Sequence, residues 1–130
     1  MQPWSHWKDT SWWKEMVHSS GQRPFIRWTP APSSSWPFMA ACFKTAHPKS
    51  PLVVITPGLK LQESMHQDLT TWLQWFSNQE NLSSFSQPYF YPAWEHLPHE
   101  AKLPHADVIS ERLETLMALL RWQSDPENQP

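Results

Sequence analysis

A turn rich in proline and serine occupies the place where a nucleotide-hydrolysing α/β protein would bind phosphate. A phosphate-binding loop, GxxxxGK[ST], brings backbone N–H groups close to the phosphates. The turn between the predicted strand 24–28 and the predicted helix 36–46 has no glycine and no lysine, and its two prolines supply no N–H donor. We therefore predict that the chain binds no nucleotide cofactor and does not hydrolyse ATP. This degenerate loop consists of Thr29, Pro30, Ala31, Pro32, Ser33, Ser34 and Ser35.

Histidines and glutamates gather in a second segment whose side chains could bind a metal ion or transfer protons. His96, His99 and His105 lie near Glu95 and Glu100. The HxxH spacing, in a loop rich in proline, lacks the helical i, i+4 geometry that presents two imidazoles to one metal ion. Nothing fixes the separation or burial of the two carboxylates, which acid–base catalysis requires. We predict neither a metal site nor catalytic residues here.

Composition excludes several classes of function. A net charge of −2 and a pI near 6.4 give no basic field over the whole chain that would hold nucleic acid. Cys42 is the only cysteine, so the chain cannot form an internal disulfide, and its apolar neighbours predict a thiol in the core. The longest apolar run is too short to span a bilayer, and the N-terminus has no signal pattern. We expect a cytoplasmic protein.

Periodicity along the chain predicts alternating strands and helices. Residues 52–55 form an unbroken aliphatic run, typical of a strand covered on both faces of a parallel sheet. The predicted elements are a short helix over 10–18, strand 24–28, helix 36–46, strand 52–55, a helix after Thr56 that reaches Phe76, strand 87–91 and a helix over 107–122 capped by Asp107. This order predicts an α/β fold, a partial RecA- or P-loop-like arrangement of three layers with a short parallel sheet flanked by helices.

Three segments together resemble the N-terminal region of bacterial transcription-repair coupling factors. The segments are PLVVITP at residues 51–57, YPAWEHLP at 91–98 and HADVISERLETL at 105–116, within a resemblance that covers about residues 21–120. The resemblance implies a module similar to the excision-repair protein UvrB, with a helicase-like α/β core that has lost its phosphate loop. We accordingly expect an aromatic-rich arm at 1–20, an incomplete UvrB-like α/β domain at 21–123 and a polar tail at 124–130.

The function that the resemblance implies is that of a scaffold. The segment would pack against neighbouring subdomains of the parent protein, help to hold the parent in an autoinhibited state and support its recruitment of UvrA. The regions that contact UvrA and RNA polymerase, and the ATP-driven motor, would lie beyond Pro130, so this chain would contact DNA weakly or indirectly. A free-standing aromatic-rich module that binds protein or single-stranded nucleic acid is the alternative, because ten of the 130 residues are tryptophan.

Trp94 and Leu97 are the strongest candidates for special roles. Trp94 and Leu97 either anchor their loop against a neighbouring domain or fix it to the edge of the predicted sheet, and the second interpretation is favoured. Arg112 is expected to pair with a carboxylate, Glu111 or Glu95, rather than with phosphate. The full set of predicted interface or loop anchors is Trp94, Glu95, Leu97, Pro98 and Arg112.

Overall fold

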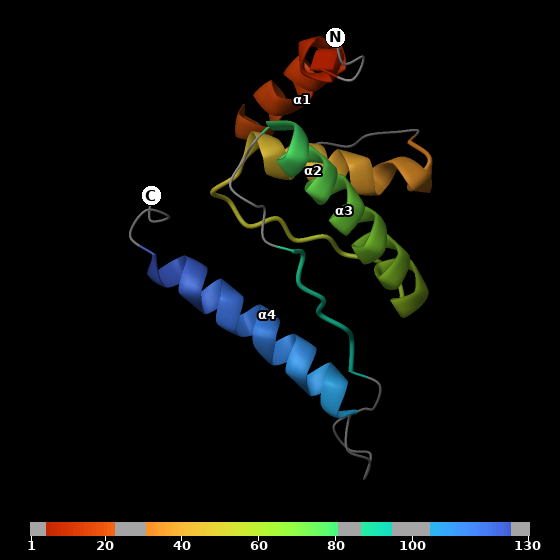
Figure 1. Cartoon of the computed structure of the whole chain (residues 1–130), viewed down its shortest axis with the longest axis vertical. Coiled ribbons are helices and arrows are strands. Elements are labelled where there is room, and N and C mark those ends of the chain that lie inside the picture. The colour runs from red at the N-terminus through yellow and green to blue at the C-terminus, as the bar shows by residue number, and fades with distance from the viewer. Residues whose placement is uncertain (1–4, 23–30, 81–86, 95–104, 126–130) are drawn as a thin grey trace. The chain divides into compact units, whose positions relative to one another are not determined.

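The structure, a computed structural model, describes residues 5–22, 31–80, 87–94 and 105–125 (Figure 1). The chain divides into two compact units, Met1–Ser35 and Trp36–Pro130. The predicted strand over 24–28 lies outside the described residues. Trp94 and Arg112, both predicted as anchors, belong to the second unit.

The first unit contains one α-helix and two short 3₁₀-helices. η1 (Ser5–Asp9) packs against α1 (Ser11–Gln22), and η2 (Ser33–Ser35) is the last element of the unit. Trp13 and Met16, three residues apart on one face of α1, are both buried. The amphipathic helix predicted over 10–18 is therefore confirmed, and it continues to Gln22.

Each of two helices in the second unit begins close to a proline. α2 (Trp36–Ala46) has Pro37 in its first turn, where the missing N–H costs nothing because that group has no partner within the helix. α3 (Leu59–Glu80) starts after Pro57, and its first described backbone bond runs from the Gln62 N–H to the Gly58 carbonyl over 3.0 Å. Both helices were predicted, although α3 begins later than the sequence suggested.

The apolar faces of α2 and α3 pack against each other and form the core of this unit. Cys42 has no exposed surface and Phe76 is 1% exposed, which confirms the predicted core thiol. Phe38 of α2 meets Trp72 of α3 edge to face, with 4.9 Å between ring centroids. Aromatic pairs of this kind contribute about 0.5–1.5 kcal/mol beyond the area that they bury. Further buried side chains are Ala41, Met65, Leu69 and Leu73.

The predicted α/β fold is wrong. Within the described residues the elements are helices, and there is no strand and no sheet. Residues 52–55, here called the aliphatic segment, and residues 87–94, here called the proline segment, are both extended. Neither makes a backbone–backbone hydrogen bond to another described residue. The partial RecA- or P-loop-like parallel sheet is therefore absent from the described part of the chain.

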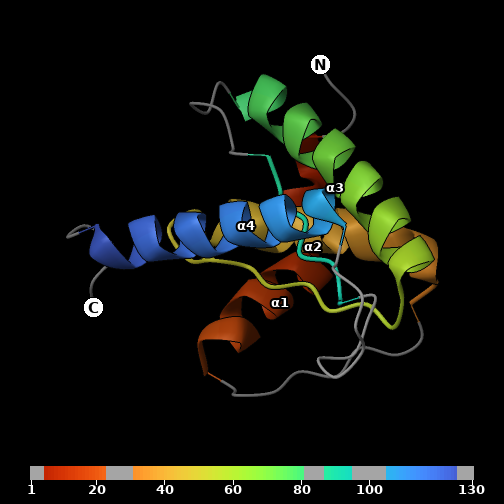
Figure 2. The same cartoon turned by 90° about the horizontal axis from the view of Figure 1, so that it is seen from below.

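Side chains take the backbone acceptors of the proline segment, which explains why it does not pair as a strand. It runs between α3 and α4 (Ala106–Ser124) (Figures 1 and 2). In a strand, residues 88, 90 and 92 would bond along one edge, but all three carbonyls are occupied, and the prolines at 88 and 92 have no N–H. The bonds join His66 Nε2 to Pro88 O (2.8 Å), Thr115 Oγ1 to Phe90 O (3.0 Å), Arg112 Nη1 to Pro92 O (2.5 Å) and Gln62 Nε2 to Tyr91 O (2.9 Å).

α4 is attached through polar side chains rather than through its aliphatic face. Arg112 and Thr115 reach the proline segment, and Trp122 Nε1 donates to the Lys49 carbonyl over 2.8 Å. The predicted N-cap is also corrected. His105 is the N-cap residue, without a side-chain capping bond, and Asp107 lies in the first turn, where a carboxylate interacts favourably with the helix dipole.

Candidate interaction surface

Arg112 fixes the proline segment to α4 by two kinds of contact. Its Nη2 donates to the Tyr91 hydroxyl oxygen over 2.7 Å, in addition to the bond from Nη1 to the Pro92 carbonyl. Its guanidinium carbon lies 4.0 Å from the centroid of the Tyr91 ring and 4.3 Å from that of Trp94. A planar, always charged guanidinium suits both contacts, because it forms hydrogen bonds in its plane and stacks on aromatic faces.

The structure brings together two of the predicted anchors and adds a third residue. Trp94 and Arg112 are in contact, as a role in anchoring would require, whereas Glu95, Leu97 and Pro98 lie outside the described residues. Within the described residues the partners of Arg112 are a carbonyl, a hydroxyl and two rings, instead of the predicted Glu111 carboxylate. Tyr91 was not singled out from the sequence, although an aromatic residue three positions before a tryptophan was the available signal.

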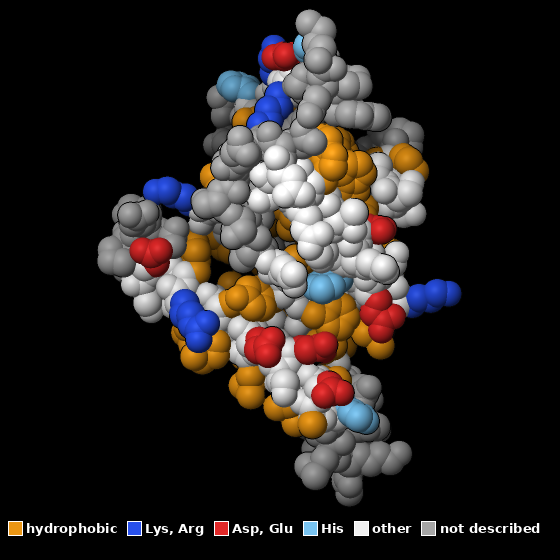
Figure 3. All heavy atoms as spheres, in the orientation of Figure 1, with side chains coloured by type: hydrophobic (Ala, Val, Ile, Leu, Met, Phe, Trp, Pro, Cys, Tyr) orange, Lys and Arg blue, Asp and Glu red, His pale blue; other side chains and the backbone are white. Residues whose placement is uncertain are grey.

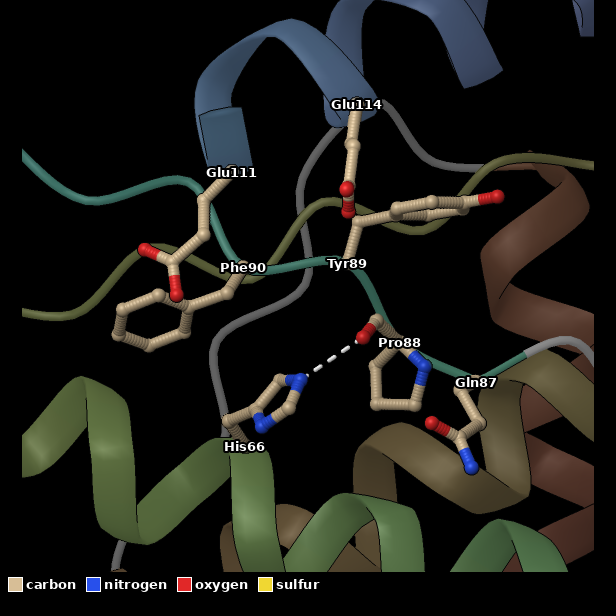
Figure 4. A pocket seen from close by; sticks show the side chains of 7 residues that line it. All are labelled: His66, Gln87, Pro88, Tyr89, Phe90, Glu111 and Glu114. Carbon is tan, nitrogen blue, oxygen red and sulfur yellow. Dashed lines mark hydrogen bonds between the residues drawn. The ribbon is translucent and has the colours of Figure 1, made fainter. Parts of the chain in front are cut away.

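An open hollow of about 300 Å³ lies between α3, the proline segment and α4. Its lining residues are His66, Gln87, Pro88, Tyr89, Phe90, Glu111 and Glu114 (Figure 4). The His66 ring points at the Pro88 carbonyl and meets the Phe90 ring edge to face, 5.4 Å between centroids. Since a carbonyl oxygen only accepts, Nε2 of His66 carries the proton. This imidazole holds backbone in place, and the described lining contains no serine, threonine or cysteine that it could activate.

The aliphatic segment presents apolar side chains to solvent. Val53 is 72% exposed and Ile55 is 91% exposed, and the alternate residues Leu52 and Val54 are each about two-fifths exposed. Residues i and i+2 of an extended chain point to the same side, so Val53 and Ile55 form one apolar edge. A single exposed aliphatic residue is ordinary on a protein surface. A continuous run of them, whose backbone has no backbone partner among the residues described, is the kind of surface that binds another polypeptide.

The degenerate phosphate loop is described only in part. Thr29 and Pro30 lie outside the described residues, and Ser33, Ser34 and Ser35 form η2. The Ser35 hydroxyl donates to the Pro32 carbonyl over 2.7 Å, and the Ser35 N–H reaches the same oxygen over 2.9 Å. The serine therefore stabilises its own turn.

The described residues contain no group of three or more histidine, cysteine, aspartate or glutamate side chains that could hold a metal ion. Glu95, His96, His99 and Glu100 are not among them, so the structure does not place that candidate cluster. No helix in the described ranges is long and apolar enough to cross a membrane.

Comparisons with protein-family models, with curated proteins and with solved structures give no match to this chain. The resemblance to transcription-repair coupling factors therefore depends on the three sequence segments alone. All three segments contain structural features described above. The aliphatic segment lies in the first, Tyr91 and Trp94 lie in the second, and Arg112 lies in the third.

Proposed function

We propose that this chain is a non-catalytic, protein-binding scaffold segment of a transcription-coupled DNA repair factor, acting in the cytoplasm. It packs against neighbouring subdomains of the parent protein and supports the parent's recruitment of UvrA, while UvrA and RNA polymerase bind elsewhere in the parent. The helicase-like α/β core that the resemblance implied is not part of this proposal. The observation that carries the proposal is the exposed aliphatic segment, whose backbone pairs with no other backbone group in the described part of the chain.

The aliphatic segment would gain free energy of burial from a partner that covers it. Full burial of one valine, leucine or isoleucine side chain stabilises a complex by about 1.5–3 kcal/mol. The exposed fractions of Val53 and Ile55 leave most of that free energy unused in this chain. A neighbouring polypeptide laid along residues 52–55 would cover both side chains and supply hydrogen-bond partners for the backbone. The segment also coincides with the first of the three sequence segments that carry the resemblance.

The contacts of Arg112 and His66 favour a binding role over catalysis. Arg112 uses its donors on Tyr91 and Pro92 and its faces on aromatic rings, so it is already committed to holding structure. His66 is committed to a carbonyl in the same way. Groups whose donors hold backbone do not transfer protons to a substrate without first releasing that backbone.

A transcription-repair coupling factor from which the corresponding N-terminal segment has been deleted provides the test. Titration calorimetry with this chain should give saturable binding, and Val53→Asp and Ile55→Asp should each weaken it at least tenfold, that is by about 1.4 kcal/mol or more. Gln74→Asp, an exposed position on α3, is the matched control. Absence of binding at about 100 μM, or equal loss in the control, would overturn the proposal. Micromolar binding of ATP with magnesium would overturn its non-catalytic part.

An aromatic-rich module for single-stranded nucleic acid is the second candidate. Tyr89, Tyr91 and Trp94 are each exposed by about half, and exposed rings can stack on bases. Arg112 already covers one face of Tyr91 and one of Trp94, which leaves less ring surface for bases. Quenching of tryptophan fluorescence by single-stranded DNA at low salt would favour this candidate, and unchanged fluorescence would exclude it.

A further inference from the structure

Side chains of two helices hold the proline segment by its backbone carbonyls. These side chains, here called the α3–α4 clamp, are Gln62 and His66 of α3 and Arg112 and Thr115 of α4. Each donates a hydrogen bond to a different carbonyl of the segment, over 2.5–3.0 Å. The two residues on α3 are four apart and the two on α4 are three apart, so each pair lies on one face of its helix. The clamp is therefore a set of donors that lies along an extended chain.

The bonds of the clamp require acceptors from the segment and no backbone donor. Pro88 and Pro92 have no N–H, so a proline at either position costs no hydrogen bond. The fixed φ of proline also lowers the entropy that an extended chain loses when it is bound. Pro92 is buried, whereas the neighbouring residues Tyr91, Ala93 and Trp94 are exposed. Pro92 is therefore the residue by which the segment is inserted into the fold.

Aromatic rings on both sides of this proline contact the clamp. The Phe90 ring meets the His66 ring edge to face, 5.4 Å between centroids, and the Arg112 guanidinium lies over the rings of Tyr91 and Trp94. In Figure 3, hydrophobic side chains reach the surface in the region between α3 and α4. The ligand that suits the clamp is therefore an extended peptide with a proline between aromatic residues, as in the sequence FYPAW of the segment itself.

We infer that the proline segment is an internal ligand of the α3–α4 clamp, and that a partner protein displaces it with an extended peptide of the same pattern. The clamp is then a peptide-recognition surface that the chain itself occupies, and the bound segment is an autoinhibitory contact. This inference uses residues other than the aliphatic segment, so it goes beyond the proposed function and does not depend on it.

The segment is bound in a way that permits exchange. Within the described residues no backbone ladder holds it as a strand, and Tyr91 and Trp94 are 41% and 51% exposed. α4 carries half of the clamp and is attached through polar side chains, so a local opening of α4 also opens the clamp. The internal segment competes with an effective concentration on the order of millimolar, because it is part of the same chain.

A fluorescein-labelled peptide of residues 87–94 is the probe, and fluorescence anisotropy measures its binding to the full chain. The double variant Tyr91→Ala/Trp94→Ala weakens the internal segment and leaves the clamp residues intact. We expect a dissociation constant on the order of 100 μM for this variant and binding about tenfold weaker, or less, for the wild type. Trp12→Ala, a tryptophan of the first unit that is 41% exposed, is the matched control and should bind as weakly as the wild type. Circular dichroism checks helix content, and Trp94→Ala alone replaces the double variant if that variant loses helix.

Two further changes test whether the clamp is what binds the peptide. Adding Arg112→Lys to the double variant should weaken binding about fivefold or more, and a peptide with Pro92→Ala should bind about threefold more weakly.

Three results would overturn the inference: no binding to the double variant at about 1 mM peptide, equal affinity of the wild type and the double variant, or an affinity that Arg112→Lys leaves unchanged. A wild-type dimer that excess peptide dissociates would make a second copy the partner, and would overturn a different protein in that role. The binding assay with Val53→Asp tests the proposed function separately, so failure of one is distinguishable from failure of the other.

Discussion

The guanidinium of Arg112 both donates a hydrogen bond to the Tyr91 hydroxyl and lies over the Tyr91 ring. The bond measures 2.7 Å from Nη2 to Oη, and the guanidinium carbon is 4.0 Å from the ring centroid. Because these residues are 21 positions apart, the pair joins α4 to a segment that has no helix of its own. Arg112 therefore attaches the proline segment to α4 at Tyr91, Pro92 and Trp94.

Arg112→Lys should destabilise the second unit although it keeps the charge. An ammonium group cannot donate to Tyr91 and Pro92 in one plane while it stacks on two rings, so we expect a loss of about 1–2 kcal/mol in the free energy of unfolding. Urea denaturation measures it. Arg121→Lys, an exposed arginine on the same helix, should cost less than about 0.5 kcal/mol. Equal effects of the two substitutions would contradict the role given to Arg112.

Thr115→Val tests the second bond between α4 and the proline segment. The Thr115 hydroxyl is placed 3.0 Å from the Phe90 carbonyl and 2.9 Å from the Glu111 carbonyl. Removing the hydroxyl leaves the Phe90 oxygen without this donor, so we expect a loss of about 1 kcal/mol. Among the described residues, the Thr71 hydroxyl donates only to the Gln67 carbonyl of its own helix, so Thr71→Val should change the free energy of unfolding by close to zero. A larger effect at Thr71 than at Thr115 would refute this account.

Lys44 should make stability rise with pH in the alkaline range. Burial lowers the pKa of Lys44 below its ordinary value of 10.5, although Nζ donates to the Pro48 and Ser50 carbonyls. Between the lowered pKa and 10.5, Lys44 binds more protons in the unfolded chain than in the folded chain, so the free energy of unfolding rises with pH. The stability that Lys44 contributes in this way is fully present above pH 10.5 and is lost as pH falls through the pKa of the folded state. As pH rises to 10.5, urea unfolding should show the wild type gaining stability relative to Lys44→Met. Parallel profiles of unfolding free energy against pH for the wild type and Lys44→Met would contradict a lowered pKa of Lys44.

Cys42 should be chemically protected in the native state. Its thiol has no exposed surface, and a reagent can reach it only when α2 and α3 separate. Reaction with a thiol-specific chromogenic disulfide should therefore be more than about 100-fold slower in buffer than in urea, since it requires an opening of the core. Rapid labelling under native conditions would show that the core formed by α2 and α3 opens easily.

The helices and the core that they form were predictable because their signals are local. Pro37 places the first turn of α2, and the stripe from Met65 to Phe76 keeps helical period over several turns, so one face had to be buried. The burial of Cys42 was predictable because its neighbours in the sequence are apolar. Trp94 and Arg112 were predicted as separate candidate anchors, but their contact was not predicted, because the sequence does not give the distance between two residues 18 positions apart.

The sheet was predicted wrongly because the periodicity of a segment does not indicate which other segment it pairs with. Residues 52–55 are aliphatic enough for a strand, but a strand needs a neighbour. In the proline segment, side chains of His66, Thr115 and Arg112 occupy the carbonyls of residues 88, 90 and 92 instead, through interactions across 20 residues or more. The same side chains turned the polar face of α4 inward. The opposite face of α4 is therefore exposed to solvent, although the apolar face of an amphipathic helix is usually buried. Its apolar residues are Ile109, Leu113, Leu116, Met117 and Leu120.

The hydrogen bond from Trp122 to Lys49 spans 73 residues and bears on the order in which the chain assembles. Closing a loop of that length costs about 4 kcal/mol of chain entropy, whereas one neutral hydrogen bond returns about 1 kcal/mol. The indole can therefore bind only after Arg112 and Thr115 have brought α4 into place. We expect α4 to dock last and to detach first, so its amides should exchange with solvent deuterium well before those at the centre of α3.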